Sequence, residues 1–166
     1  ESCVQGVALI GEMQRGLALT KSVAKLTESG LSDQWTPTQF WLYRAMIHAG
    51  KSALSLGDGP YAEELFSKVF LNIKEKVNFG FDRIDLLQEL ITAVKNLTSA
   101  RRFDLTGDIL EETLSACQDV GEFGQEVLLN LVSTVADDIV RGESAYAMAL
   151  KRWKGDEERL IRDRIS

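Results

Sequence analysis

Apolar residues recur along this chain at steps of three and four residues, and that spacing predicts amphipathic α-helices. The stretch 36–73 is the clearest case, because two such helices flank a short turn at Leu56–Pro60. Segments in which apolar and polar residues alternate, as they do in half-buried strands, are nearly absent. The pattern therefore predicts an all-α fold of six to eight helices, arranged as consecutive antiparallel hairpins.

Residues 36–39 specify the start of the first helix of this hairpin. Thr36 occupies the N-cap position, and Pro37 stands at the first helical position, where its missing N–H costs nothing. Gln39 stands where the glutamine of a capping box reaches back to the N-cap residue. The sequence therefore predicts a helix that begins at Pro37 and runs to Leu56.

An aromatic cluster surrounds this helix start. Trp35 and Phe40 hold the two positions of a hydrophobic staple, so the start of the helix explains part of the cluster. Trp41 and Tyr43 complete it. The alternative interpretation is that the cluster forms an exposed aromatic surface that binds a partner.

The hairpin also carries the spacing of a known repeat. Gly50, Gly57, Ala62 and Phe66 stand where a tetratricopeptide repeat places its small, turn, small and aromatic residues, so residues 43–76 resemble that family. Small residues let the two helices approach, and the aromatic residue fills the groove between them. The resemblance implies tetratricopeptide-like stacking of hairpins. No constant period covers the whole chain, so an irregular helical bundle is the alternative.

The rest of the chain divides into further helical segments and one charged tail. Residues 1–153 are predicted to form a single all-helical domain, and residues 154–166 a charged helical extension that is mobile or bound to a partner. The expected helices outside the hairpin cover, approximately, residues 3–29 as one or two helices, 82–102, 104–119, 123–140 and 144 onward.

Charge and cysteine usage narrow the class of protein. The net charge of −6 is concentrated in residues 103–147, where ten acidic residues face Arg141 alone, and this disfavours binding to nucleic acid. Apolar runs are shorter than the roughly 18 residues of a spanning helix, so no membrane insertion is expected. Cys3 and Cys117 do not form a disulfide framework, and a cytoplasmic or otherwise intracellular protein is expected.

No motif for catalysis, metal binding or cofactor binding is present, so neither an enzyme nor a cofactor is predicted. His48 is the only histidine, which removes any site built from several histidines. Asp104, Thr106 and Asp108 resemble the first ligands of a calcium loop, but Ile109 stands where that loop requires glycine.

The leading functional hypothesis is a protein-interaction domain, such as an adaptor, chaperone or regulatory subunit, that presents a helical groove to a peptide or helix. Another protein is thus the expected partner, and a homo-oligomer is compatible with the sequence. One alternative is a self-assembling structural protein such as a coat component. Another is a helical enzyme with a pocket around His48. The residues expected to contact a partner are Tyr43, Met46, Ile47, Gly50, Lys51, Trp153, Leu160 and Ile161.

Overall fold

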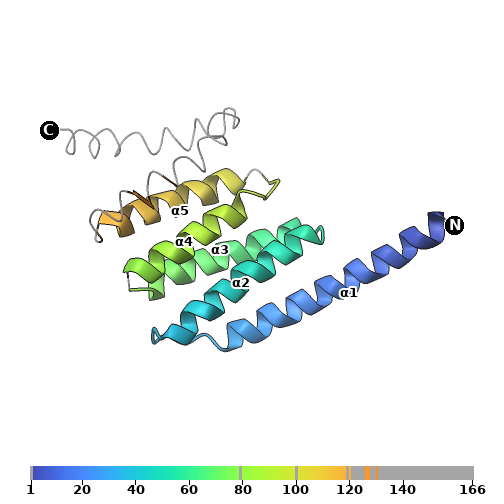
Figure 1. Ribbon diagram of the computed structural model, residues 1–166, viewed down its shortest axis with the longest axis horizontal. Helices are drawn as coiled ribbons and strands as arrows, with labels where there is room; N and C mark the ends of the chain where they lie inside the picture. Colours follow the sequence, from blue (N-terminus) through green and yellow to red (C-terminus); the bar gives the residue numbers. More distant parts are fainter. Residues whose placement is uncertain are drawn as a thin grey trace.

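The structure is a computed structural model that describes residues 2–78, 80–99, 101–118, 120, 126–127 and 130, with side chains from residue 10 onward. The described residues contain helices and no strand, which confirms the all-α class (Figure 1). Five helices have described bounds, where six to eight were predicted; the segments 123–140, 144 onward and 154–166 lie largely or wholly outside the described residues. The helices are α1 (Ser2–Ser29), α2 (Pro37–Ser55), α3 (Gly59–Lys76), α4 (Gly80–Val94) and α5 (Arg101–Gln118).

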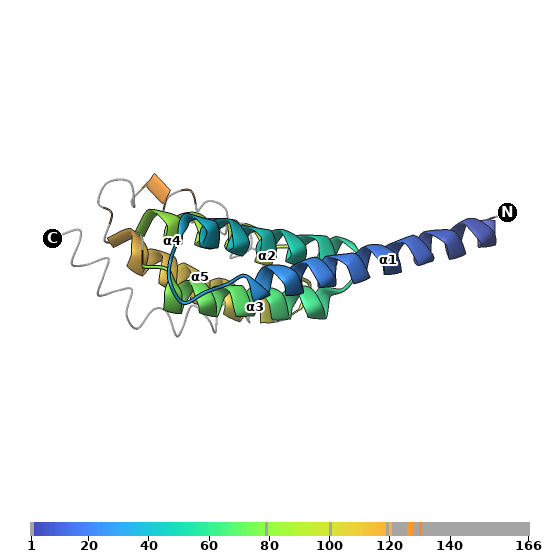
Figure 2. The same ribbon diagram turned by 90° about the horizontal axis from the view of Figure 1, so that it is seen from below.

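The helices α2 to α5 pack in two layers, and consecutive helices among them are antiparallel (Figure 1). Figures 1 and 2 show α2 beside α4 in one layer and α3 beside α5 in the other, so α2–α3 and α4–α5 form successive hairpins. The C-terminal half of α1 packs along α2, and its N-terminal half projects past the other described helices (Figures 1 and 2). α2 contacts α1, α3 and α4, so it joins the N-terminal helix to the rest of the described structure.

Gly50 permits the close approach of α2 to α3. A Cβ atom at this position would lie 2.3 Å from Cε1 and 2.9 Å from Cδ1 of Phe66, closer than real atoms approach. Phe66 is completely buried, as are Ala53 and Ala62 at the same helix pair. The packing role that the spacing of these residues predicted for Gly50 and Phe66 is therefore present.

The turn between α2 and α3 depends on Gly57 and Asp58. Gly57 has φ +87°, a left-handed conformation that glycine adopts without steric strain. Asp58 caps α3, because its Oδ1 accepts a hydrogen bond of 3.1 Å from the backbone N–H of Tyr61. The other oxygen of Asp58 lies 2.7 Å from Nζ of Lys21, which ties α1 to the same turn.

The capping box predicted at Thr36 and Gln39 is not formed. Thr36 has the extended backbone of an N-cap residue but makes no side-chain capping bond. Gln39 is buried and turns toward the loop instead: its Oε1 accepts from the backbone N–H of Ser32 at 3.0 Å, and its Nε2 donates to the carbonyl of Gly30 at 3.1 Å. Gln39 therefore fastens α2 to the end of α1.

The helix predicted over 82–102 is divided in the structure. α4 ends at Val94, and α5 begins at Arg101, three residues before its predicted start. Leu97 lies in the connection but is buried, so its apolar side chain continued the helical spacing without belonging to a helix. The guanidinium of Arg102 donates to the carbonyl oxygens of Leu97 (3.2 Å) and Lys95 (3.5 Å), which satisfies exposed acceptors after the end of α4.

The start of α4 also differs from the sequence-based expectation. The helix begins at Gly80, two residues before the predicted start at residue 82. Asp82 lies inside the first turn, and its Oδ2 accepts a hydrogen bond of 3.1 Å from the indole Nε1–H of Trp35. This contact joins the start of α4 to the loop before α2.

Replacing Gly50 by alanine tests the close approach of α2 and α3. We expect Gly50→Ala to lower the free energy of unfolding by about 1–3 kcal/mol, because the new methyl group must displace the ring of Phe66. Gly107→Ala is the matched control: this glycine is also helical, but nothing lies within 4 Å of its Cβ position. The free energy of unfolding of the control should rise by about 0.5–1 kcal/mol. Urea unfolding measures this free energy for both variants, and an equal rise in the two would contradict the packing.

The charge on Asp58 should make stability depend on pH. The hydrogen bond from Lys21 lowers the pKa of Asp58 below its ordinary 3.8. Folding therefore favours the ionised carboxylate, and its contribution is present above 3.8 and lost as the pH falls through the lower, folded-state pKa. Asp58→Asn keeps a capping oxygen but loses the charge. We expect the variant to be less stable at neutral pH, with a difference that narrows in acid; parallel pH profiles of urea unfolding would rule this out.

Candidate functional site on the α2–α4 surface

Four residues expected to contact a partner lie in the core. Tyr43, Met46, Ile47 and Gly50 are all buried, so their apolar spacing marks contacts within the molecule, and they do not line a groove. Burial also raises the pKa of the Tyr43 phenol. In this conformation the four residues stabilise the packing around α2 and are covered from solvent.

The remaining predicted contacts have different positions. Lys51 lies at the surface of α2 and contacts Glu89 of α4. Trp153, Leu160 and Ile161 lie outside the described residues. Of the five predicted residues that the structure describes, only Lys51 lies at an accessible surface, where it belongs to the polar cluster described next.

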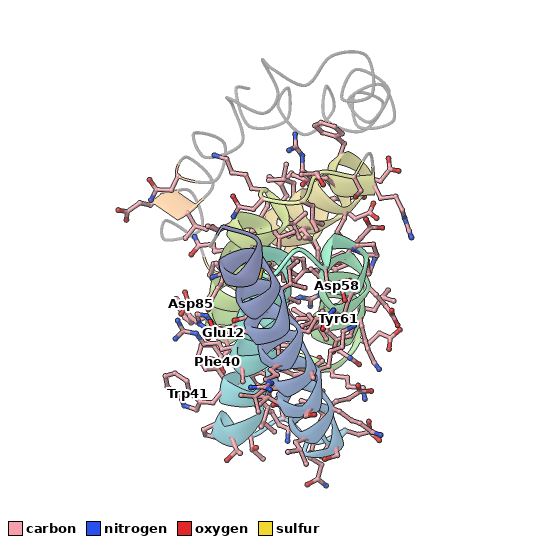
Figure 3. All side chains as sticks on the ribbon, turned by 90° about the vertical axis from the view of Figure 1, so that its right-hand side faces the viewer. Glu12, Phe40, Trp41, Asp58, Tyr61 and Asp85 are labelled. Carbon is pink, nitrogen blue, oxygen red and sulfur yellow. The ribbon has the colours of Figure 1, made fainter. Side chains whose placement is uncertain are left out.

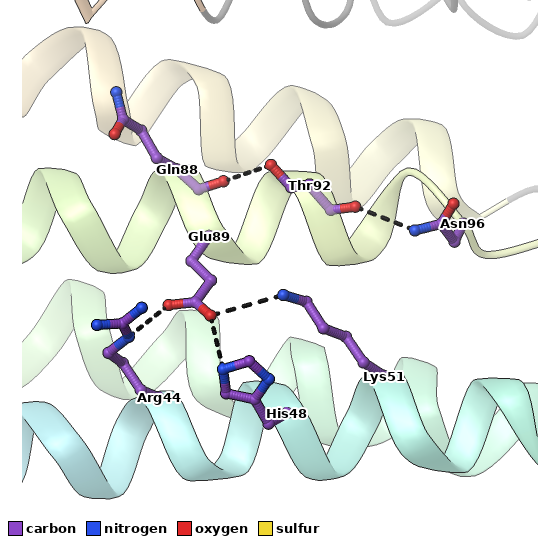
Figure 4. A network of polar contacts seen from close by, with 7 residues as sticks. All are labelled: Arg44, His48, Lys51, Gln88, Glu89, Thr92 and Asn96. Atoms are coloured by element: carbon purple, nitrogen blue, oxygen red, sulfur yellow. Dashed lines mark hydrogen bonds and ion pairs between the residues drawn. The ribbon is translucent and has the colours of Figure 1, made fainter.

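Three side chains of α2 converge on Glu89 of α4 (Figure 4). One carboxylate oxygen lies 2.7 Å from Nε of Arg44. The other lies 3.0 Å from Nε2 of His48 and 3.5 Å from Nζ of Lys51. The side chain of Glu89 is only 16% exposed, so its charge is partly shielded from water by the groups that surround it.

Helical geometry places these three residues in register. Arg44, His48 and Lys51 are spaced by four and three residues, and such positions share one face of a helix. Trp41 lies three residues before Arg44 and continues the same face. This face is open to solvent, whereas the other face of α2 is buried. The exposed face of α2 is therefore a stripe of one tryptophan and three nitrogen-bearing side chains.

An aromatic patch adjoins the polar cluster. Phe40 and Trp41 pack edge to face with ring centroids 5.4 Å apart, and the guanidinium carbon of Arg44 lies 5.3 Å from the Trp41 centroid and 5.7 Å from that of Phe40. Trp41 is 62% exposed. Seen from the N-terminal end of α1, both rings lie on the side of the molecule that also carries Asp85 (Figure 3).

A hollow of about 370 Å³ lies between α2 and α4. One aromatic side chain and five polar or charged side chains line it. One of the polar groups is already used within α4: the hydroxyl of Thr92 donates a hydrogen bond of 2.9 Å to the backbone carbonyl of Gln88 (Figure 4). The lining residues are Phe40, Arg44, Asp85, Gln88, Glu89 and Thr92. We call these residues, together with Trp41, His48 and Lys51, the α2–α4 surface.

The histidine–carboxylate pair of this surface is open to solvent on the histidine side. A histidine bonded to a carboxylate is one part of many general-base sites. Here the side chain of His48 is 61% exposed, and Glu89 is shared with Arg44 and Lys51 rather than reserved for the imidazole. Such a setting lacks the water exclusion that strengthens catalytic electrostatics. Within the described residues, no group of three or more potential metal ligands comes together.

The sequence analysis named Trp41, His48 and Lys51 of this surface but neither Arg44 nor Glu89. Trp41 was included in a cluster for which an exposed binding surface was the alternative interpretation. Glu89 was missed because it lies 45 residues from Arg44, and nothing local links the two. The signal that was present is the spacing of Trp41, Arg44, His48 and Lys51 on one helix face.

Comparisons of the chain with protein-family models, with curated proteins and with solved structures each found no match. The functional interpretation therefore depends on the residues themselves. Among the described helices, none combines the length and the apolar composition that crossing a membrane requires.

Removing the carboxylate of Glu89 should destabilise the packing of α2 on α4. We expect Glu89→Ala to lower the free energy of unfolding by about 1–2 kcal/mol, because three nitrogen-bearing groups lose their shared acceptor. Glu111→Ala removes the same group from an exposed position of α5 and should change stability by less than about 0.5 kcal/mol. Urea unfolding at low and high salt measures the free energy of unfolding of both variants. Equal losses in the two would show that the contacts of Glu89 do not stabilise the fold.

Proposed function

We propose that this chain is a protein-interaction domain that binds a peptide or helix at the α2–α4 surface. The observation that carries the proposal is the exposed Trp41, held against Arg44 beside a hollow. Tryptophan and arginine are the residues most enriched among those that dominate binding energy at protein interfaces. The side chain of Trp41 is 62% exposed, so most of its ring is available to a partner.

The surface matches a partner that presents an apolar side chain next to a hydrogen-bond acceptor. The apolar group would pack on Phe40 and Trp41. Glu89 engages Nε of Arg44, which leaves the terminal guanidinium nitrogens to bind a carboxylate or a backbone carbonyl of the partner. Asp85 and Gln88 at the opposite wall would accept from or donate to polar groups of the same segment.

The energy available from Trp41 is sufficient for a specific contact. Covering the exposed part of a tryptophan removes roughly 100–150 Å² from water, which corresponds to about 3 kcal/mol. Cation–π contact with Arg44 adds a further contribution when a partner excludes water from the pair. Loss of this one side chain should therefore weaken binding by about two orders of magnitude.

The arrangement of hairpins agrees with this role. In the tetratricopeptide-like interpretation of residues 43–76, α2 and α4 are the first helices of two successive hairpins, and a partner binds along that layer. An adaptor, chaperone or regulatory subunit inside the cell would use such a surface. The buried residues Tyr43, Met46, Ile47 and Gly50 would then support the binding surface from below.

Quantitative affinity capture tests the proposal. The immobilised chain should retain at least one specific protein from a cell extract, and Trp41→Ala and Arg44→Ala should each reduce the retained amount at least tenfold. Leu71→Ala is the control, because Leu71 is also an exposed apolar residue but lies on α3, in the other layer. A version that ends at residue 153 reports separately on the predicted C-terminal contacts. No specific protein, or equal retention by the Trp41 and Leu71 variants, would refute the proposal.

A further inference from the structure

α1 buries less apolar surface than the other described helices. Among its described side chains only Ala24 and Thr27 are buried, and Leu17 packs against the core while partly exposed. α3, by comparison, buries six residues, which include two phenylalanines. The other large apolar side chains of α1 lie at the surface, where Leu19 is 67% and Leu26 is 72% exposed. Because the hydrophobic contribution scales with the apolar area removed from water, α1 is the described helix that burial stabilises least.

Charged side chains join α1 to the α2–α3 hairpin. Nζ of Lys21 lies 2.7 Å from Oδ2 of Asp58 and 4.8 Å from the ring centroid of Tyr61. Nearer the end of α1, Glu28 pairs with Lys68 of α3. The four side chains of these two ion pairs are between 21% and 46% exposed, so water and salt screen them. The attachment of α1 is therefore weak and depends on the salt concentration.

α1 covers one face of α2. A Cβ atom at Gly30 would lie 3.3 Å from Cδ1 of Leu42, and a Cβ atom at Gly16 would lie 3.4 Å from Cδ1 of Leu56. α1 thus runs antiparallel to α2 along nearly its whole length. Ala49 is buried and stands two helical turns from each leucine, so it lies on the same face. If α1 leaves, the strip of Leu42, Ala49 and Leu56 loses its cover.

The loop that follows α1 is fastened independently of α1. The amide of Gln39 bonds the carbonyl of Gly30 and the backbone N–H of Ser32. Nζ of Lys76 lies 2.8 Å from Oδ1 of Asp33 in the same loop. A detaching α1 would therefore turn about its junction with Gly30, because residues at the end of an element absorb such a hinge motion.

We propose that α1 is a releasable cover: it detaches as one unit from the α2–α3 hairpin and exposes the apolar strip of α2 at Leu42, Ala49 and Leu56. Few buried apolar contacts and exposed ion pairs characterise segments that open locally, at a smaller free energy than the whole fold. Helices α2 to α5 stay packed during this opening, because Ala24 is the only residue that α1 contributes to the buried core of the described residues. The opening controls access to the strip, which is separate from the α2–α4 surface.

Hydrogen exchange of the full chain, followed by mass spectrometry, tests the proposal. Amides of residues 16–29, the half of α1 that lies along α2, should exchange at least about tenfold faster than amides inside α3 and α4, after correction for intrinsic rates. Raising the salt concentration to about 1 M should accelerate exchange in α1 further and leave α3 unchanged, because salt screens the ion pairs of α1.

Lys21→Gln and Lys25→Gln form a matched pair, since each removes one lysine charge from α1. Lys21 contacts Asp58, whereas Lys25 is exposed and forms no ion pair with a described residue. We expect Lys21→Gln to accelerate exchange of residues 16–29 by about threefold or more, and Lys25→Gln to leave it unchanged.

Thiol labelling tests whether the strip itself becomes accessible. Ala49 is 6% exposed, so the new thiol of Ala49→Cys is covered while α1 is in place. We expect it to react faster at high salt, and faster again when Lys21→Gln is added. Cys117, which is buried in α5, is the internal control and should stay protected under the same conditions.

Three results would each overturn the proposal. The first is exchange in residues 16–29 that is as slow as in α3. The second is equal acceleration by the two lysine variants. The third is a thiol at position 49 that stays as protected as Cys117 at every salt concentration. Circular dichroism of each variant confirms that the fold is retained, so faster exchange cannot be attributed to global unfolding.

Discussion

The contact between the bare backbone of Gly50 and the ring of Phe66 sets the distance between α2 and α3. Any side chain at position 50 would occupy the space that the ring already fills. α2 also packs on α1 and α4, so the position of this one helix determines where three neighbours lie. The turn at Gly57 and the cap at Asp58 then hold the two helices antiparallel at that short distance.

The two faces of α2 differ because one is buried against the other helices and one is exposed. Its buried face, which includes Tyr43 and Ile47, has no polar contact with solvent. Its exposed face carries Trp41 and Arg44, which contact each other. Glu89 fastens this exposed face to α4. A backbone that is already ordered by packing lowers the entropy cost of binding, which supports the recognition role proposed for this surface.

Local features of the fold could be predicted from the sequence, and features that join distant segments could not. The α2–α3 hairpin was predicted with its turn and apolar faces, because Gly57 and the residues beside it act on their own neighbours. The break after Val94 was missed since Leu97 is buried and keeps the helical spacing. Burial also explains why core residues were expected in a groove: apolar spacing identifies a covered face but does not say what covers it. The partner of Arg44 is 45 residues away, beyond any local pattern.

The surface proposed to bind a partner depends on this hairpin, because α2 carries Trp41 and Arg44 and packs on α3. The most direct measurement of the central contact is a nuclear Overhauser spectrum of the folded chain. Strong cross-peaks between the α-protons of Gly50 and the ring protons of Phe66 are predicted by their close approach. Absence of these cross-peaks, with both resonances assigned, would contradict the hairpin packing from which the rest of the structure follows.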